Sequence, residues 1–277
     1  MTDRDPRQGV ATVGADPGAA LAELLEVMRR LRNPEGGCPW DLAQDFASIA
    51  PHTLEEAYVV ADAIERGEPA GICDELGDLL FQVVFHAQLG DERRWFDFAA
   101  VAAGIAAKLR RRHPHVFGAE GPADVLEHGA NWERIKAAER GAGGDSATLG
   151  GIARTLPALS RASKLGKRAG RVGFDWPDAV GVRDKVSEEL AELDAVLADP
   201  LGGAAGRSEE LGDLLFAVAN WGRHLGIDPE DALRAANRKF ERRFATMETA
   251  ARLRGRALES LSPAEWDAFW NDAKRVE

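Results

Sequence analysis

The chain has 277 residues, 45% of them hydrophobic, and this length allows two domains with substantial buried cores. A formal net charge of −11 excludes the dominant basic surface that nucleic-acid and anionic-membrane binding require, so we expect neither partner. The two cysteines are too few for a disulfide scaffold, and no apolar stretch has the length of a signal core or membrane span, so we expect a cytoplasmic protein.

The first half of the chain is predicted to be a helical domain over residues 19–140, after a polar tail over residues 1–18 that we expect to be disordered. The turn-rich segment that holds Trp40 is expected to be a loop pinned by the ring of this residue. Apolar residues at helical spacing, separated by turn signals, predict helices over residues 19–32, 51–66, 70–89, 96–112 and 125–140.

A glycine-rich segment over residues 141–155 is predicted to link this domain to a second one over residues 156–277. The second half is again expected to be helical. It begins with a basic helix over residues 156–171 and two acidic helices, followed by a long helix capped by Asp228 and a final helix capped by Ser262. No strand pattern occurs in the sequence, so the fold is predicted to be all-α.

Each of the two acidic helices of the second half carries a pair of carboxylates spaced three residues apart. Glu189 and Glu192 stand three residues apart, as do Glu210 and Asp213, and this step keeps both members of a pair on one helix face. If the glycine-rich break over residues 200–206 lets the helices lie antiparallel, all four carboxylates face one point. Such a group is stable only with bound cations, and Mg²⁺ or Mn²⁺ suits oxygen ligands at this density. The alternative for either pair alone is a solvated acidic helix face.

The acidic motif occurs in both halves of the chain, and both copies contain the string ELGDLLF. The earlier copy keeps three of the four acids, which are Glu56, Glu75 and Asp78. The counterpart of Glu192 in this copy is Val59. One helical unit has therefore been used twice, and the copies differ in their number of carboxylates.

Several strings beside the acidic motifs, among them NPEGGCPWD, RRHPHVFG, KRAGRVGFDWPD and ANRKFERRF, occur in an order that resembles the MazG family of nucleoside triphosphate pyrophosphohydrolases. The resemblance extends from about Leu21 to Val276 and matches the tandem form of the family. It implies two MazG-like helical bundles in an enzyme that is usually homodimeric and depends on Mg²⁺. It further implies conversion of an NTP or dNTP to the monophosphate and pyrophosphate, as nucleotide-pool control or house-cleaning.

The resemblance also assigns roles to residues of the second half. It implies metal ligands at Glu189, Glu192, Glu210 and Asp213. It implies nucleotide contacts at Lys185, Glu188, Glu189, Glu209, Asp213, Lys239, Arg243 and Trp270. We expect Glu188 to orient or deprotonate the attacking water, whereas packing is the commoner use of a residue such as Trp270. Because Val59 replaces the third acid of the motif, the first domain is expected to be inactive or structural.

Other classes of protein fit the sequence less well. A ferritin-like di-iron bundle uses ExxH elements, which neither acidic segment contains. A histidine-aspartate phosphohydrolase needs an adjacent His-Asp pair, which the chain lacks. A non-catalytic helical dimerisation or sensor module that binds metal and nucleotide would use the same ligands, and only turnover separates it from an enzyme.

Overall fold

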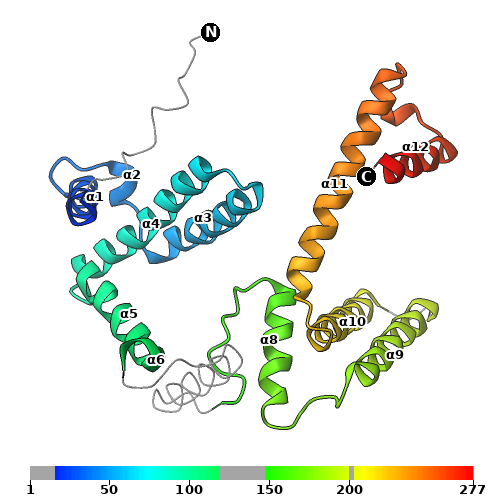
Figure 1. Cartoon of the computed structure of the whole chain (residues 1–277), viewed down its shortest axis with the longest axis horizontal. Coiled ribbons are helices and arrows are strands. Elements are labelled where there is room, and N and C mark those ends of the chain that lie inside the picture. The colour runs from blue at the N-terminus through cyan, green and yellow to red at the C-terminus, as the bar shows by residue number, and fades with distance from the viewer. Residues whose placement is uncertain (1–15, 119–146, 200–202, 277) are drawn as a thin grey trace. The chain divides into compact units, whose positions relative to one another are not determined.

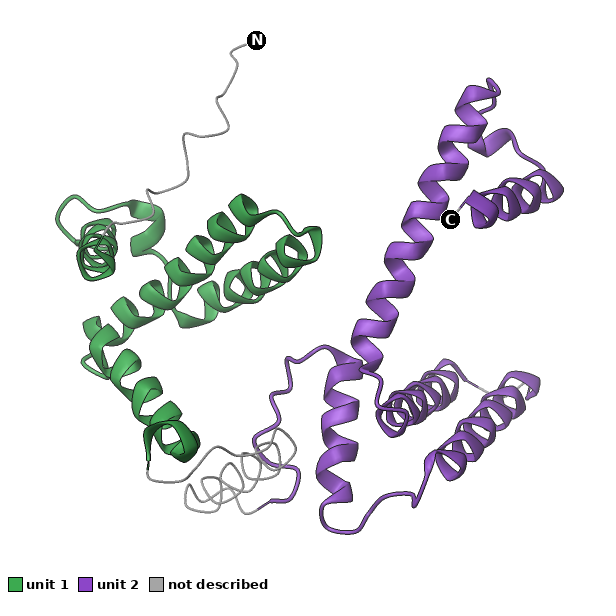
Figure 2. Ribbon diagram, in the orientation of Figure 1, with its two compact units in different colours: residues 1–135 green, residues 136–277 purple. Residues whose placement is uncertain are grey.

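The computed structural model describes residues 16–118, 147–199 and 203–276, and the chain divides into two compact units over residues 1–135 and 136–277 (Figure 2). Every regular element within these described ranges is a helix, which confirms the all-α prediction. None of the described helices combines the length and the apolar composition of a membrane span. The predicted helix over residues 125–140 lies outside the described residues, as do most of the predicted tail and part of the predicted linker.

Unit 1 is organised around a hairpin of two long helices (Figure 1). Its elements are α1 (Pro17–Leu31), α2 (Pro39–Leu42), α3 (Phe46–Arg66), α4 (Pro69–Glu92), α5 (Phe98–Arg112) and α6 (Pro114–Phe117). Helix α4 packs along α3 and also contacts α1 and α5. The buried core joins α1, α3 and α4 through Met28, Ile49, Val84, Phe85 and Leu89. This core cluster therefore lies toward the start of α3 and the end of α4, whereas the acids lie in the middle of α3 and in the first half of α4.

Helix α3 begins at Phe46, earlier than the predicted start at Pro51. Asp45 caps it, because its side chain accepts a hydrogen bond from the Ser48 backbone N–H while the Ser48 hydroxyl accepts one from the Asp45 backbone N–H. Pro51 lies inside the first turns of the helix rather than at its start. The sequence prediction was wrong because proline is also common at helix starts, while the capping box at Asp45 was overlooked.

The segment between α1 and α3, which includes the short helix α2 and is thus not the predicted simple loop, is held by an arginine rather than by Trp40, which is 54% exposed. Arg32 is buried, donates to the Asp41 backbone carbonyl and forms two hydrogen bonds of 2.7 Å with the Glu92 carboxylate. The prediction that an aromatic ring pins this loop was therefore wrong. A buried guanidinium can satisfy several backbone and carboxylate acceptors at once, which a tryptophan ring cannot.

Unit 2 contains a second helix hairpin and an additional helix pair (Figure 1). Its elements are α8 (Ala158–Gly170), α9 (Ala179–Ala198), α10 (Ala204–His224), α11 (Pro229–Leu253), the 3₁₀ helix η1 (Leu258–Ser260) and α12 (Pro263–Val276). Helix α10 packs along α9 and against α8, while α12 packs against α11. A buried cluster at the α11–α12 contact includes Met247 and Phe269. The caps predicted at Asp228 and Ser262 are confirmed.

Helices α8 and α10 approach each other closely at Gly166, where a Cβ atom would collide with the side chain of Asn220. Asn220 is 1% exposed, donates to the Phe216 carbonyl at 3.1 Å and accepts from Arg223 Nε at 3.2 Å. Arg223 in turn forms a bidentate pair with Asp175, with N–O distances of 2.6 and 2.8 Å. The absence of a side chain at Gly166 thus lets α8 pack on the helix that carries Glu210 and Asp213.

Candidate functional site

In unit 2, α9 and α10 bring three carboxylates together, one from α9 and two from α10. Glu189, Glu210 and Asp213 each offer one oxygen, and these oxygens lie within 4.8 Å of one another. Glu189 is 6% exposed, Glu210 is partly exposed and Asp213 is exposed, so the group is open to solvent on one side. The predicted facing of the two acidic helices therefore produces one compact group of oxygen ligands.

Lys185 lies one turn before Glu189 on α9 and neutralises part of this negative charge. Its Nζ atom is 2.7 Å from one carboxylate oxygen of Glu188 and 2.7 Å from one of Glu189. The hydrogen bonds with Glu188 and Glu189 raise the pKa of Lys185, so the amine stays charged. Sequence reasoning treated Lys185 only as a nucleotide contact and missed this pairing, although a lysine four residues from a glutamate is a usual helical ion pair.

The negative charge in the group affects Glu210 most clearly. Partial burial raises the pKa of Glu210, and the charges of Glu192, Asp213, Glu189 and Glu209 raise it further. Glu192 does not belong to the close group of three but lies near enough for its charge to act on Glu210. The ionised form of Glu210 is thus less favourable than that of a free glutamate, and a bound cation would offset this effect.

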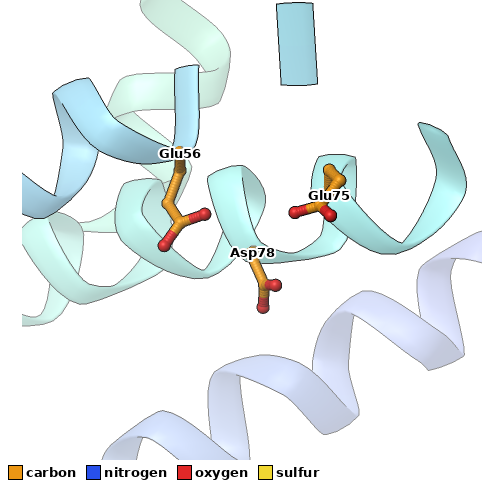
Figure 3. Close-up of side chains that lie close together, drawn as sticks. All are labelled: Glu56, Glu75 and Asp78. Atoms are coloured by element: carbon orange, nitrogen blue, oxygen red, sulfur yellow. The ribbon is translucent and has the colours of Figure 1, made fainter. Parts of the chain in front are cut away.

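Unit 1 contains the corresponding group, formed by Glu56, Glu75 and Asp78, whose carboxylate oxygens also lie within 4.8 Å of one another. Figure 3 shows the three side chains, with Glu56 on α3 and the other two on α4. Burial raises the pKa of Glu56, and the charges of Asp78, Glu55 and Glu75 raise it further. The position of Lys185 is taken here by His52, whose Nδ1 atom is 3.7 Å from Glu55. The two groups thus share their geometry and differ in the cation beside them.

The three remaining predicted residues, Lys239, Arg243 and Trp270, lie on α11 and α12. The ring of Trp270 lies 5.4 Å from that of Phe240, and the Arg243 guanidinium lies 5.9 Å above the Trp270 ring. Trp270 therefore packs on α11, whereas the carboxylate group is formed by α9 and α10. Of the predicted metal ligands, the structure brings Glu189, Glu210 and Asp213 together but not Glu192. Lys185 lies beside this group, whereas Arg243 and Trp270 lie together on other helices.

The donor set of unit 2 fits a hard divalent cation. All three close ligand atoms are carboxylate oxygens, and neither histidine nor cysteine belongs to the group among the described residues. Oxygen-only ligands suit Mg²⁺, Mn²⁺ and Ca²⁺ rather than softer metals, and Mg²⁺ is commonly held by one or two carboxylates together with substrate phosphates. The group can therefore hold a metal ion while leaving coordination positions for water or phosphate.

Comparison with known proteins agrees with this geometry. The sequence profile of the MazG nucleotide pyrophosphohydrolase domain matches residues 44–117. A nucleoside triphosphate pyrophosphohydrolase from Escherichia coli strain K12 is 48% identical over 260 residues, which are 93% of this chain and 98% of that protein. A Thermotoga maritima protein named nucleoside triphosphate pyrophosphohydrolase/pyrophosphatase MazG is 43% identical, over 94% of this chain and 97% of that protein. Near-complete coverage at this identity shows that the chain belongs to the MazG nucleotide pyrophosphohydrolase family.

Proposed function

We propose that the chain hydrolyses nucleoside and deoxynucleoside triphosphates to the monophosphate and pyrophosphate at the carboxylate group of unit 2. The observation that carries this proposal is the convergence of Glu189, Glu210 and Asp213 beside Lys185. The names of the E. coli and T. maritima relatives support the reaction class. A role in nucleotide-pool control or house-cleaning in the cytoplasm follows from this chemistry.

Glu189, Glu210 and Asp213 would hold Mg²⁺, with Mn²⁺ as a possible substitute, and Glu192 is the proposed fourth ligand. The metal ion would supply charge neutralisation for the phosphates. The chain's own residues do the rest: Glu188 orients the attacking water and accepts its proton, while Lys185 holds Glu188 and Glu189 in place through its two ion pairs. The new bond forms between the water oxygen and the α-phosphorus. The bond from the α-phosphorus to the bridging oxygen breaks, and pyrophosphate leaves.

Two residues favour unit 2 over unit 1 as the catalytic copy. Val59 removes the carboxylate that corresponds to Glu192, and His52 replaces the permanent positive charge of Lys185. The Nδ1 atom of His52 lies 3.7 Å from Glu55, whereas the Nζ atom of Lys185 lies 2.7 Å from both Glu188 and Glu189, so the acids of unit 1 have a less closely paired cation. Unit 1 is thus proposed to be structural, although its three close acids resemble those of unit 2.

For the nucleotide contacts, we propose Lys239, Arg243 and Trp270 together with Glu209 and the acids described above. Lys239 and Arg243 are one helical turn apart on α11, so both can face one ligand. Trp270 offers an aromatic ring beside Arg243, and every nucleobase has a face that can stack on such a ring. Because stacking tolerates different bases, this arrangement agrees with broad specificity.

The chain is further proposed to form a homodimer through an apolar stripe on α10. Leu211, Leu215 and Val218 share one face of this helix, and between 40% and 49% of each residue is exposed. Unit 1 exposes the same stripe at the equivalent positions Leu76, Leu80 and Val83. Two copies of the chain can therefore cover both stripes with matching surfaces.

We expect the protein to sediment as a dimer at micromolar concentration and the Leu211→Glu variant to shift toward the monomer. A glutamate on the stripe would disfavour contact between the two copies, because its charged carboxylate would lose its hydration in the interface. Leu253→Glu is the matched control, since Leu253 is 84% exposed near the end of α11. A monomeric wild-type protein would contradict the proposed interface.

The pH dependence of stability follows from the raised pKa of Glu210. A carboxyl whose pKa is higher in the folded state binds its proton more tightly there, so it destabilises the metal-free fold once pH rises above that pKa. We expect metal-free Glu210→Gln to melt at a higher temperature than wild type at pH 7, with a smaller difference near pH 5. Mg²⁺ should raise the melting temperature of the wild-type protein. It should raise the melting temperature of the variant much less. Thermal unfolding at both pH values measures this, and a lower melting temperature for metal-free Glu210→Gln at pH 7 would contradict it.

The experiment that tests the proposed function is a pyrophosphate-release assay over common and modified NTPs and dNTPs, with and without Mg²⁺. We expect release that depends on the metal and extends over several bases. A folded protein that binds nucleotide and Mg²⁺ without turnover would instead be the non-catalytic sensor module. The same panel of nucleotides identifies the preferred substrate.

A further inference from the structure

Helix α8 carries an arginine that has one unpaired N–H donor among the described residues. Arg161 is half-buried, and its Nε atom is buried without a hydrogen-bond acceptor. A buried donor without a partner costs free energy, and for a charged group this cost is larger, so native proteins rarely leave one without a ligand. The Nε–H group of Arg161 therefore lacks an acceptor within the described part of the chain.

Arg161 lines a groove of about 440 Å³ between α8 and α10. Arg154, which precedes α8, also lines it, so two positive charges face the same space. The groove is otherwise mostly apolar, and the wall on the α10 side is formed by Gly212, Leu215 and Phe216. An acidic side chain does not line the groove among the described residues, although the chain as a whole is acidic. The groove thus combines two arginines with mostly apolar walls.

The groove lies next to the carboxylate group because both use α10. Gly212 on the groove wall directly precedes Asp213, and one residue turns a helix by about 100°. The groove and the carboxylates therefore occupy neighbouring faces of a helix whose diameter with side chains is about 10–12 Å.

A nucleoside triphosphate needs positive charge beyond a metal ion held at the α-phosphate. Lys185 is already paired with Glu188 and Glu189, so part of its charge is committed. A guanidinium presents several N–H donors in one plane and matches the oxygens of a phosphate, and such charge-assisted bonds are about twice as strong as neutral ones. Arg161 has both this chemistry and an open groove in front of it.

We propose that Arg161, assisted by Arg154, binds the β- and γ-phosphates of the substrate and later the pyrophosphate product. This inference rests on the proposed function in that it concerns the substrate of the same site. Arg161 positions the leaving group while the carboxylate group acts at the α-phosphorus. The phosphate tail would then lie in the groove between α8 and α10.

The test compares Arg161→Gln, Arg161→Lys and a control, Lys164→Gln, which removes one positive charge from an exposed position on the same helix. One charge-assisted hydrogen bond is worth about 1.5–3 kcal/mol, which is roughly tenfold or more in affinity. We expect Arg161→Gln to raise KM for ATP about tenfold with a smaller change in kcat. Arg161→Lys should recover part of this loss, and Lys164→Gln should stay within about twofold of wild type.

Calorimetry with Mg²⁺ and inorganic pyrophosphate or AMP provides a second readout that does not require turnover, so it remains decisive if the proposed function fails. Arg161→Gln should weaken pyrophosphate binding about tenfold and leave AMP binding unchanged. Equal weakening of both ligands, or unchanged pyrophosphate affinity with a lower melting temperature, would overturn the assignment in favour of packing. A loss of dimer by Arg161→Gln with unchanged pyrophosphate affinity would show that the partner of Arg161 is an acid of a second copy.

Discussion

Glu189→Gln is expected to lower kcat for ATP by at least about a hundredfold. Glu189 supplies one of the three close oxygens of the metal group and is the most buried of these residues. A glutamine keeps the shape but not the charge, and metal-held charge supplies several kcal/mol to catalysis, with about 1.4 kcal/mol for each factor of ten. Steady-state kinetics with a series of Mg²⁺ concentrations measures the loss and shows whether added metal restores activity.

Glu56→Gln is the matched control, because Glu56 holds the equivalent position in unit 1. We expect this variant to retain most of the wild-type kcat, since Val59 and His52 stand beside it instead of a carboxylate and a lysine. Melting temperatures of both variants show whether a loss of activity is a loss of fold. Comparable losses from the two substitutions would contradict a single catalytic unit.

Gly166→Ala is expected to lower the free energy of unfolding by about 2 kcal/mol, the middle of the range for overpacked interiors. The new methyl group would collide with the Asn220 side chain, which is buried and tied to Phe216 and Arg223. Asn220 can move only by giving up these hydrogen bonds or by separating α8 from α10. Chemical denaturation measures the change.

Gly104→Ala is the control for the substitution itself, because Gly104 lies inside α5 and a Cβ there meets nothing within 4 Å. We expect a gain of about 0.5–1 kcal/mol in this case, since alanine favours the helix over glycine. The double variant Gly166→Ala/Asn220→Ala should be more stable than the sum of the single changes predicts, because the collision is absent. Additive losses in this cycle would place the cause of the destabilisation elsewhere.

The sequence was sufficient to predict the fold class and the helix faces that carry the acids. A three-residue step places Glu210 and Asp213 on one helix face wherever the helix packs, so their proximity follows from the helix alone. Their meeting with Glu189 required the antiparallel hairpin, which the glycine-rich break made a reasonable expectation. The caps at Asp228 and Ser262 were predictable because capping depends on local side-chain to backbone bonds.

The sequence did not predict which residues form the tertiary contacts. Arg32 holds a loop through partners nine to sixty residues away, so no local pattern distinguishes it from neighbouring arginines. The unpartnered Nε of Arg161 also becomes apparent only when α8 lies against α10. The family profile matches residues 44–117, in unit 1, so membership by itself does not identify the catalytic copy. We propose that single positions such as Val59 carry that distinction.

The most direct test of hydrolysis at the unit 2 group is product analysis by phosphorus NMR, with ATP, Mg²⁺ and water labelled with heavy oxygen. The wild-type protein should form AMP and pyrophosphate in equal amounts, with the label in the AMP phosphate, because water attacks the α-phosphorus. Glu189→Gln should form neither product at a comparable rate. ADP and orthophosphate as products, label in pyrophosphate, or full activity of Glu189→Gln would contradict the proposed site and reaction.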